Sequence, residues 1–127
     1  MKKALRVLVD GTVEDLDLDA PEGALSVLQN GVKFDDADTY PLVQPVDIAE
    51  DLTMWVHEEG KMLGHPYNSA GSIVFDGAFG QNIDRIFGNI VFTGGTDEEG
   101  DTLGLPEKYD AGLRGLAFTI WDIRNKV

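Results

Sequence analysis

Apolar and polar residues alternate near the start of the chain, in a pattern typical of two short β-strands. Leu5, Val7 and Val9 lie at every second position, which places their side chains on one face of a strand. The dipeptide Asp10-Gly11 follows, and Asp-Gly is favoured in tight hairpin turns because both positions tolerate positive φ. We therefore predict a β-hairpin whose second strand covers residues 12–18.

The apolar spacing then becomes helical. Apolar residues recur at helical intervals over residues 24–28, and Asp19-Ala20-Pro21-Glu22 before them has the spacing of a capping box. Asn30-Gly31 is typical of a left-handed helix end. The pattern predicts a helix over residues 20–30, followed by the start of a strand at residues 32–34.

Strand-like runs alternate with turn residues through the middle of the chain. Residues 52–57 are rich in strand formers, and Glu59-Gly60 indicates a turn that would return the chain as a second hairpin over residues 61–63. Residues 66–82 contain several glycines and predict mainly loop around a short apolar run. Residues 83–93 predict another strand.

Proline and glycine divide the remaining segments. Pro45 favours an edge strand or irregular structure for its surroundings. An acidic loop is predicted over residues 96–105, and Pro106 marks the start of a helix. Residues 117–123 are β-branched and aromatic, so we predict a strand there, with continuation of the helix as the alternative.

Together these elements predict a single domain, residues 1–127, of the α+β class. Its architecture would be a small antiparallel sheet with one or two short helices packed on one face. A hydrophobic content of 43% in 127 residues supports one core. The chain has no cysteine, which excludes disulfides and thiolate metal sites. No apolar run approaches the roughly 20 residues of a membrane helix, so no membrane association is expected.

The formal net charge of −13 is unevenly distributed. Residues 1–59 hold 14 acidic and 4 basic residues, a balance of −10, which leaves −3 for residues 60–127. An acidic surface repels nucleic acid and anionic membranes, because both are bound through cationic side chains. The charge therefore argues against direct nucleic-acid binding and favours a basic protein partner, or serves solubility alone.

A nine-residue phrase occurs twice, over residues 58–66 and 98–106, and both copies have the form Glu-Glu-Gly-x-x-Leu-Gly-x-Pro. The recurrence has two interpretations. It is either a duplicated hairpin edge or a coincidence in a chain rich in glycine and acidic residues. The second copy lacks both the preceding strand pattern and the lysine of the first, so we expect the two copies to differ in structure.

The residues around the first copy also carry a family resemblance. The matching positions are Glu58, Glu59, Gly60, Lys61, Leu63, Gly64, Pro66 and Asn68. They are similar to the pattern Asn-Glu-Glu-Gly-Lys-Leu-Leu-Gly-Leu-Pro-Pro-Asn-Arg of domain-of-unknown-function family 3846, whose members are carried by phages and mobile elements. The chain departs from this pattern at His57, Met62, His65, Tyr67 and Ser69. Further similarity lies at residues 28–31, 84–88 and 108–109.

The resemblance implies a small protein of phage or mobile-element origin, located in the cytoplasm of an infected bacterial host. It implies no catalytic residues, because no activity is associated with the family. The sequence also lacks a nucleophile elbow and a phosphate-binding Walker loop. Asp15, Asp17 and Asp19 do not begin a calcium loop, since Ala20 and Ser26 occupy the positions that need glycine and glutamate. We interpret these aspartates as a solvated strand face.

His57 and His65 are the only histidines and, with Glu58 or Glu59, could supply metal ligands. The predicted hairpin around Glu59-Gly60 would separate them, however, so we expect no metal site and no cofactor.

We therefore predict a non-enzymatic accessory protein that acts by binding a host or defence protein, with a homodimer left open. The predicted binding residues are Glu58, Glu59, Gly60, Lys61, Gly64, Pro66, Tyr67 and Asn68. The first alternative is a protein that binds or sequesters a nucleotide, with a pocket formed by the glycine-rich residues 71–80 and the Lys61 turn. The negative charge opposes an anionic ligand unless Lys61, Arg85 and Arg114 converge. The second is a metal-dependent enzyme that uses the two histidines.

Overall fold

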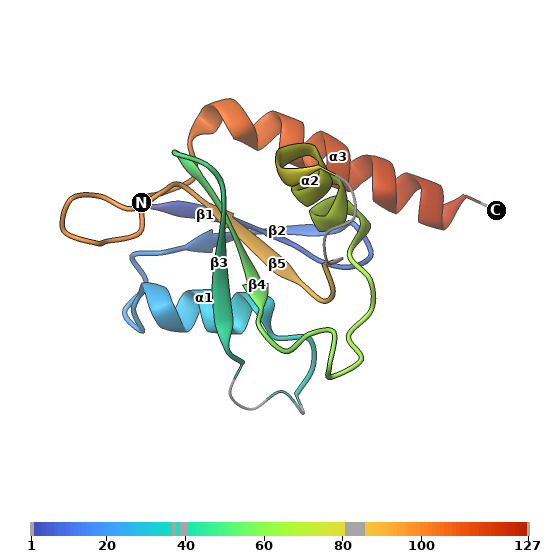
Figure 1. The fold of residues 1–127 in the computed structure, drawn as a ribbon, viewed down its shortest axis with the longest axis horizontal. Coiled ribbons are helices and arrows are strands. Elements are labelled where there is room, and N and C mark those ends of the chain that lie inside the picture. The colour runs from blue at the N-terminus through green and yellow to red at the C-terminus, as the bar shows by residue number, and fades with distance from the viewer. Residues whose placement is uncertain (1, 37, 39–40, 81–85, 127) are drawn as a thin grey trace.

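The computed structural model describes residues 2–36, 38, 41–80 and 86–126 (Figure 1). Helices are interspersed among the strands along the chain. The elements are β1 (Lys3–Val7), β2 (Val13–Asp17), α1 (Ala24–Val32), β3 (Val43–Ala49), β4 (Leu52–His57), α2 (Ser69–Phe79), β5 (Ile90–Thr93) and α3 (Glu107–Asn125).

The strands form one antiparallel sheet in the order β2-β1-β5-β4-β3. The N-terminal hairpin is confirmed, with Leu5 of β1 opposite Asp15 of β2. β3 is an edge strand and contains Pro45, as expected for a residue that cannot donate a backbone hydrogen bond. The α+β class with an antiparallel sheet is therefore confirmed.

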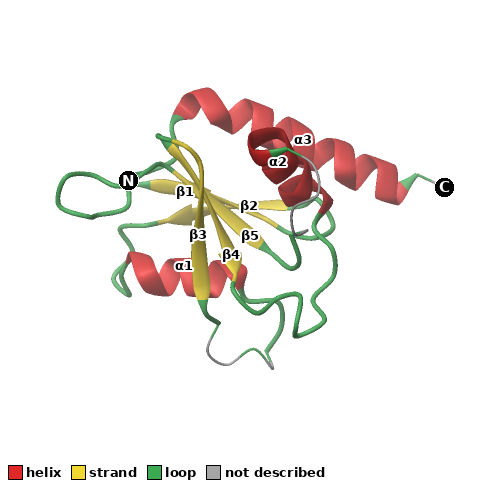
Figure 2. Cartoon of the chain, in the orientation of Figure 1, coloured by secondary structure: helices red, strands yellow, loops and turns green. Residues whose placement is uncertain are grey.

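Helices cover both faces of this sheet, so the expected placement on one face is wrong (Figure 2). Ile90 and Phe92 of β5 belong to a core cluster with residues of α2 and α3. Val91, between them, points to the opposite face and joins a second cluster with Val27 and Leu28 of α1. Successive residues of a strand point to opposite faces. A central strand that is buried throughout therefore requires cover on both faces.

Helix α1 begins and ends later than its sequence pattern predicts. Gly23 precedes its first residue, without a side-chain cap. Gly31 lies inside the helix rather than at a left-handed end. Glycine serves close packing there, because a Cβ would be 2.4 Å from Cγ2 of Val91. The helix continues to Val32, so the strand predicted for residues 32–34 is wrong.

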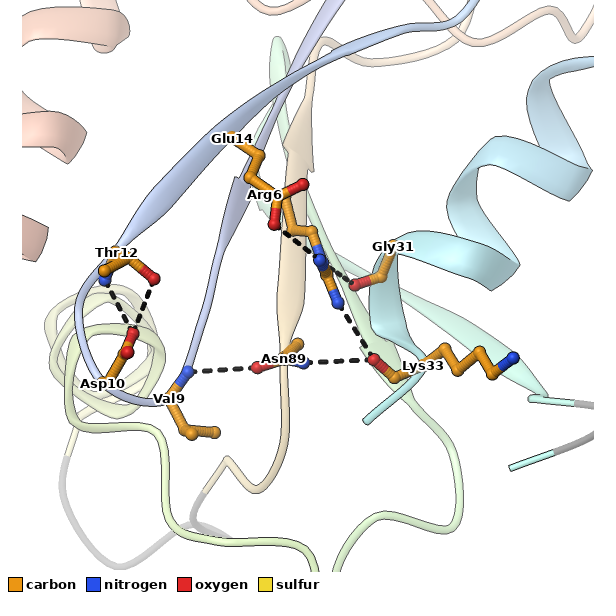
Figure 3. A network of polar contacts seen from close by, with 8 residues as sticks. All are labelled: Arg6, Val9, Asp10, Thr12, Glu14, Gly31, Lys33 and Asn89. Atoms are coloured by element: carbon orange, nitrogen blue, oxygen red, sulfur yellow. Dashed lines mark hydrogen bonds and ion pairs between the residues drawn. The ribbon is translucent and has the colours of Figure 1, made fainter. Parts of the chain in front are cut away.

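Two side chains of the sheet region bind the C-terminal carbonyls of α1 (Figure 3). Arg6 donates from Nε to the Gly31 carbonyl at 2.7 Å and from Nη2 to the Lys33 carbonyl at 3.1 Å. Asn89 donates to the same Lys33 carbonyl at 3.1 Å and accepts from the Val9 amide at 3.1 Å. A cation at this position complements the negative end of the helix. These side-chain contacts therefore fix the end of α1, in place of the left-handed glycine that the sequence predicts.

Three other predicted elements need correction. Residues 61–63 form turns rather than a strand, and the stretch predicted as loop over 66–82 contains helix α2. The described part of the strand predicted for residues 83–93 is limited to Ile90–Thr93, and residues 83–85 lie outside the described residues.

Helix α3 begins directly after Pro106, as predicted, and continues through residues 117–123. The strand predicted there is wrong and the alternative of a longer helix is right. Leu113 and Ala117 are buried, and Tyr109, Leu116 and Ile120 pack against the same core. This spacing matches one helical face, so packing outweighs the β-preference of the local residues.

Ion pairs attach α3 to the N-terminal hairpin. Lys3 of β1 lies 3.3 Å from Asp15 and 3.5 Å from Asp110, while Arg114 pairs with both carboxylates. The Arg114 side chain, more than Lys3, holds the pKa values of Asp15 and Asp110 below their usual range. Asp15 is exposed, as its interpretation as part of a solvated face predicts, and it forms these ion pairs at the surface.

Candidate functional site

The two copies of the repeated phrase define two equivalent segments, residues 58–68 (the first-copy segment) and residues 98–108 (the second-copy segment). The first-copy segment follows β4 as a compact series of turns. The Leu63 amide donates to the Glu59 carbonyl, and the His65 amide donates to the Gly60 carbonyl, both at 2.9 Å. The predicted hairpin about Glu59-Gly60 is wrong because β4 pairs instead with β3 and β5.

A buried asparagine ends the first-copy segment and joins it to the core. Asn68 is fully buried and caps α2, since its Oδ1 accepts from the Gly71 amide at 2.9 Å. Its Nδ2 donates to the carbonyls of Gly88 at 2.9 Å and Val7 at 3.3 Å. One side chain thus satisfies backbone groups of three different segments.

The first-copy segment also lies against residues 86–88. The Gly88 amide donates to the Pro66 carbonyl at 2.7 Å, and the Asn68 amide donates to the Ile86 carbonyl at 2.8 Å. A Cβ on Gly60 would lie 2.7 Å from the Phe87 carbonyl oxygen. Gly60 is therefore required for close backbone approach, and the base of the segment is fixed on several sides.

His57 forms a buried polar contact beneath the segment. Its Nε2 lies 3.1 Å and 2.9 Å from the two carboxylate oxygens of Asp38. Its Nδ1 accepts from the Glu59 amide at 3.1 Å. A nitrogen that accepts a hydrogen bond carries no proton, so these contacts assign the proton of the neutral ring to Nε2.

His65 lies with its ring edge-to-face against the His57 ring. Its ring centroid lies 4.9 Å from that of His57 and 5.1 Å from that of Phe34. Its Nδ1 is buried and has no hydrogen-bond partner among the residues that the structure describes. Burial lowers the pKa of His65 and the neighbouring His57 lowers it further, whereas Asp38 and Asp35 oppose the shift.

Asp38, His57 and His65 therefore form a cluster, in which one ligand atom from each lies within 4.8 Å of the others. The sequence argument that separated the two histidines is wrong because its hairpin does not form. Asp38 was missed altogether: it lies 19 residues before His57, and a lone aspartate in an acidic loop gives no signal of this contact.

The eight predicted binding residues divide by burial. Gly60 and Asn68 are buried and Glu59 is half-buried, so these residues support the segment. Five face solvent, namely Glu58, Lys61, Gly64, Pro66 and Tyr67. The sequence prediction omitted Met62 and Leu63, whose side chains are 73% and 53% exposed; their apolar character had suggested a strand.

The pocket expected for a nucleotide rests on premises that need correction. Residues 71–79 belong to helix α2 rather than to a glycine-rich loop. Gly71 allows close packing, since a Cβ there would lie 2.8 Å from Cδ1 of Ile90. Arg114 is engaged by Asp15 and Asp110, and Arg85 lies outside the described residues.

Comparison with known proteins supports the family resemblance. A family model described as a domain of unknown function, DUF3846, matches residues 39–114, more than half of the 127 residues. The chain belongs to this family. The matched range includes both copies of the phrase and excludes the similarity at residues 28–31. Searches of curated proteins and of solved structures each returned no match.

Among the residues that the structure describes, no helix combines the length and apolar character needed to cross a membrane.

Proposed function

We propose that this DUF3846 protein is a non-enzymatic accessory protein of phage or mobile-element origin that binds a host or defence protein in the bacterial cytoplasm. The first-copy segment is the contact surface. The partner surface is basic, with apolar positions that receive Met62 and Leu63.

The observation that carries the proposal is the exposure of large apolar side chains on a fixed base. Met62, Leu63 and Tyr67 are 73%, 53% and 40% exposed. Exposed apolar residues on a positioned loop are typical of interaction sites, because loops supply contacts while the scaffold limits the entropy lost on binding. Burial of a side chain such as Met62 or Leu63 stabilises a complex by roughly 1.5–3 kcal/mol.

Charge supports the choice of a basic partner. The net charge of −13 produces an attractive field for a cationic surface and a repulsive one for nucleic acid. Such complementarity accelerates association and makes it sensitive to salt. Glu58 is exposed at the start of the segment and lies close in sequence to the apolar side chains, so apolar and electrostatic contacts would act together.

Capture from bacterial lysate at low salt tests the proposal, with the immobilised full chain as bait. Leu63→Ser is compared with Leu103→Ser, the equivalent position of the second-copy segment, which is 41% exposed. We expect a discrete partner that Leu63→Ser and Met62→Ser lose and that Leu103→Ser retains, with retention falling as salt increases. Equal capture by Leu63→Ser and Leu103→Ser, or no captured partner at low salt, would refute the proposed surface.

A further inference from the structure

Three potential metal ligands converge beneath the first-copy segment. One ligand atom from each of Asp38, His57 and His65 lies within 4.8 Å of the others. The site is nearly enclosed, because the side chains of His57 and Asp38 are 1% and 7% exposed and His65 is 8% exposed. We propose that these three residues bind one divalent transition-metal ion of the zinc type, and that binding changes the conformation at Glu59.

The chemistry of the donors selects the class of ion. Two imidazoles and one carboxylate form a normal ligand set for zinc, and three protein ligands leave a fourth position for water or another donor. Magnesium and calcium prefer shells composed of oxygen. The ion preference is therefore zinc, cobalt or nickel over magnesium and calcium.

The geometry needs only small adjustments. Zinc bonds of about 2.0–2.1 Å place the ligand atoms of a tetrahedral site roughly 3.4 Å apart. The Nε2 atom of His57 and the Asp38 oxygens are now 2.9–3.1 Å apart, so these atoms must move slightly apart. The most widely separated ligand atoms of the cluster, which lie within 4.8 Å of each other, must move closer together. In addition, the buried Nδ1 of His65 has no hydrogen-bond partner within the described part of the chain, and such buried polar atoms are rare in folded proteins.

Metal binding requires the ring proton of His57 to change its position. Its Nδ1 now accepts from the Glu59 amide, and its Nε2 carries the proton that faces Asp38. A metal ion at the Asp38 side requires the lone pair of Nε2, so the ring proton moves to Nδ1 and the ring stays neutral. Two donors, the Nδ1 proton and the Glu59 N–H, would then face each other.

The Glu59 amide must therefore turn away when the ion binds. Glu59 lies at the first turn of the first-copy segment, and the Leu63 amide donates to its carbonyl. The Glu59 N–H belongs to the peptide that joins Glu58 to Glu59, and the Glu59 carbonyl belongs to the next peptide. Turning the first peptide changes ψ of Glu58 and φ of Glu59, and so alters the entry into the turn that carries Met62 and Leu63. The site is consequently a metal-responsive support for that turn.

Zinc titration of the chelator-treated full chain tests the binding step, by calorimetry and by the visible absorption of the cobalt(II) form. We expect one ion per chain in the wild type. His57→Asn and His65→Leu should each weaken binding at least about tenfold, and both substitutions introduce the residue that the family pattern has there. Glu99→Gln is the matched control, because Asp97, Glu99 and Asp101 form an exposed cluster of oxygen donors and its loss should leave the affinity unchanged.

Nitrogen-15 NMR tests the coupling. We expect zinc to transfer the His57 ring proton from Nε2 to Nδ1 and to shift the Glu59 amide signal, with neither change in His65→Leu. If a histidine variant does not fold, as judged by circular dichroism, Asp38→Asn takes its place.

Equal zinc affinity in the wild type and the ligand variants would overturn the site. Specific binding with an unchanged His57 tautomer and Glu59 signal would overturn the coupling. Both measurements use the isolated protein, so neither depends on the proposed partner.

Discussion

The two copies of the repeated phrase use their shared glycines in opposite ways. In the first-copy segment Gly64 is left-handed, with φ 75°, while Gly60 is buried against the Phe87 carbonyl. In the second-copy segment the order is reversed. Gly100 is left-handed, with φ 84°, and a Cβ on Gly104 would lie 3.2 Å from the Lys3 amide nitrogen. Equivalent glycines of the two copies therefore adopt different conformations, although the short sequence around them is shared.

The surroundings determine which conformation forms. The first-copy segment follows the largely buried strand β4, contains His65 of the histidine cluster and ends at the buried Asn68. The second-copy segment forms a small loop in which Thr96 bridges Thr102, and Asp97 Oδ1 accepts from the amides of Glu99 and Asp101 at 2.9 Å. These bonds are local and exposed. Buried contacts from distant segments thus define the first copy. Local bonds define residues 98–101 of the second copy, whose later part is joined to β1 by the Leu105 amide, which donates to the Lys3 carbonyl at 2.7 Å.

The largest expected effect comes from the last position of each segment. Asn68→Ala should lower the free energy of unfolding by at least about 3 kcal/mol, because three backbone groups lose a buried partner at about 1–3 kcal/mol each. Lys108, the equivalent residue, pairs with Asp51 at 2.5 Å on the surface, so Lys108→Ala should change stability little. Urea unfolding measures both. Similar effects for the two variants would show that burial does not distinguish the segments.

A smaller effect is expected at the first glycine of each segment. Gly60→Ala should cost about 1–3 kcal/mol through contact with the Phe87 carbonyl, and should shift the NMR signals of His57 and His65. Gly100→Ala should cost about 1 kcal/mol through left-handed strain and leave those signals in place, because no atom of the described residues lies within 4 Å of its added Cβ. Histidine signals that move equally in both variants would contradict the separation of the two environments.

The smallest effect concerns the ion pairs that hold α3, the helix that follows the second copy. Arg114 is the main cause that lowers the pKa of Asp110 below 3.8, with a contribution from Lys3. The stabilisation is therefore present above pH 3.8 and is lost as pH falls through the lower folded pKa.

Asp110→Asn should accordingly destabilise the protein by less than about 1 kcal/mol at neutral pH, and by less still well below pH 3.8. Urea unfolding of both proteins at the two pH values measures this difference. Asp15 faces the same two cations, so the two carboxylates are coupled. The same comparison in an Asp15→Asn background separates the contribution of Asp110 from that of Asp15. A difference that grows on acidification would contradict the assigned sign.

The sequence predicts the parts of the fold that depend on local pattern. The strand over residues 52–57, the N-terminal hairpin and the helix start at Pro106 all follow from spacing and turn residues within a few positions. The element over residues 69–79 could not be recognised, because its hydrophobic residues do not form one face: Ile73 and Phe79 are 51% and 45% exposed. Its start depends on Asn68, whose partners Val7 and Gly88 are distant in sequence.

The candidate site was predictable in location but not in structure. The family pattern indicates residues 58–68, and the family assignment is confirmed by the match over residues 39–114. Which of these residues face solvent depends on the packing of residues 86–88 against Gly60 and Asn68, a tertiary contact that no local pattern encodes. The convergence of Asp38 with the two histidines is likewise a consequence of β4 ending beside the loop that contains Asp38.

Native-state hydrogen exchange of the two segments tests the central contrast most directly. The amides of His65 and Asn68 donate to the carbonyls of Gly60 and Ile86, and they should exchange only through unfolding that is close to global. The amides of Glu99 and Asp101, bonded to Asp97 on an exposed loop, should exchange through local opening and show much weaker protection. Equal protection of the two pairs would contradict the account that the first copy stands on a buried base and the second does not.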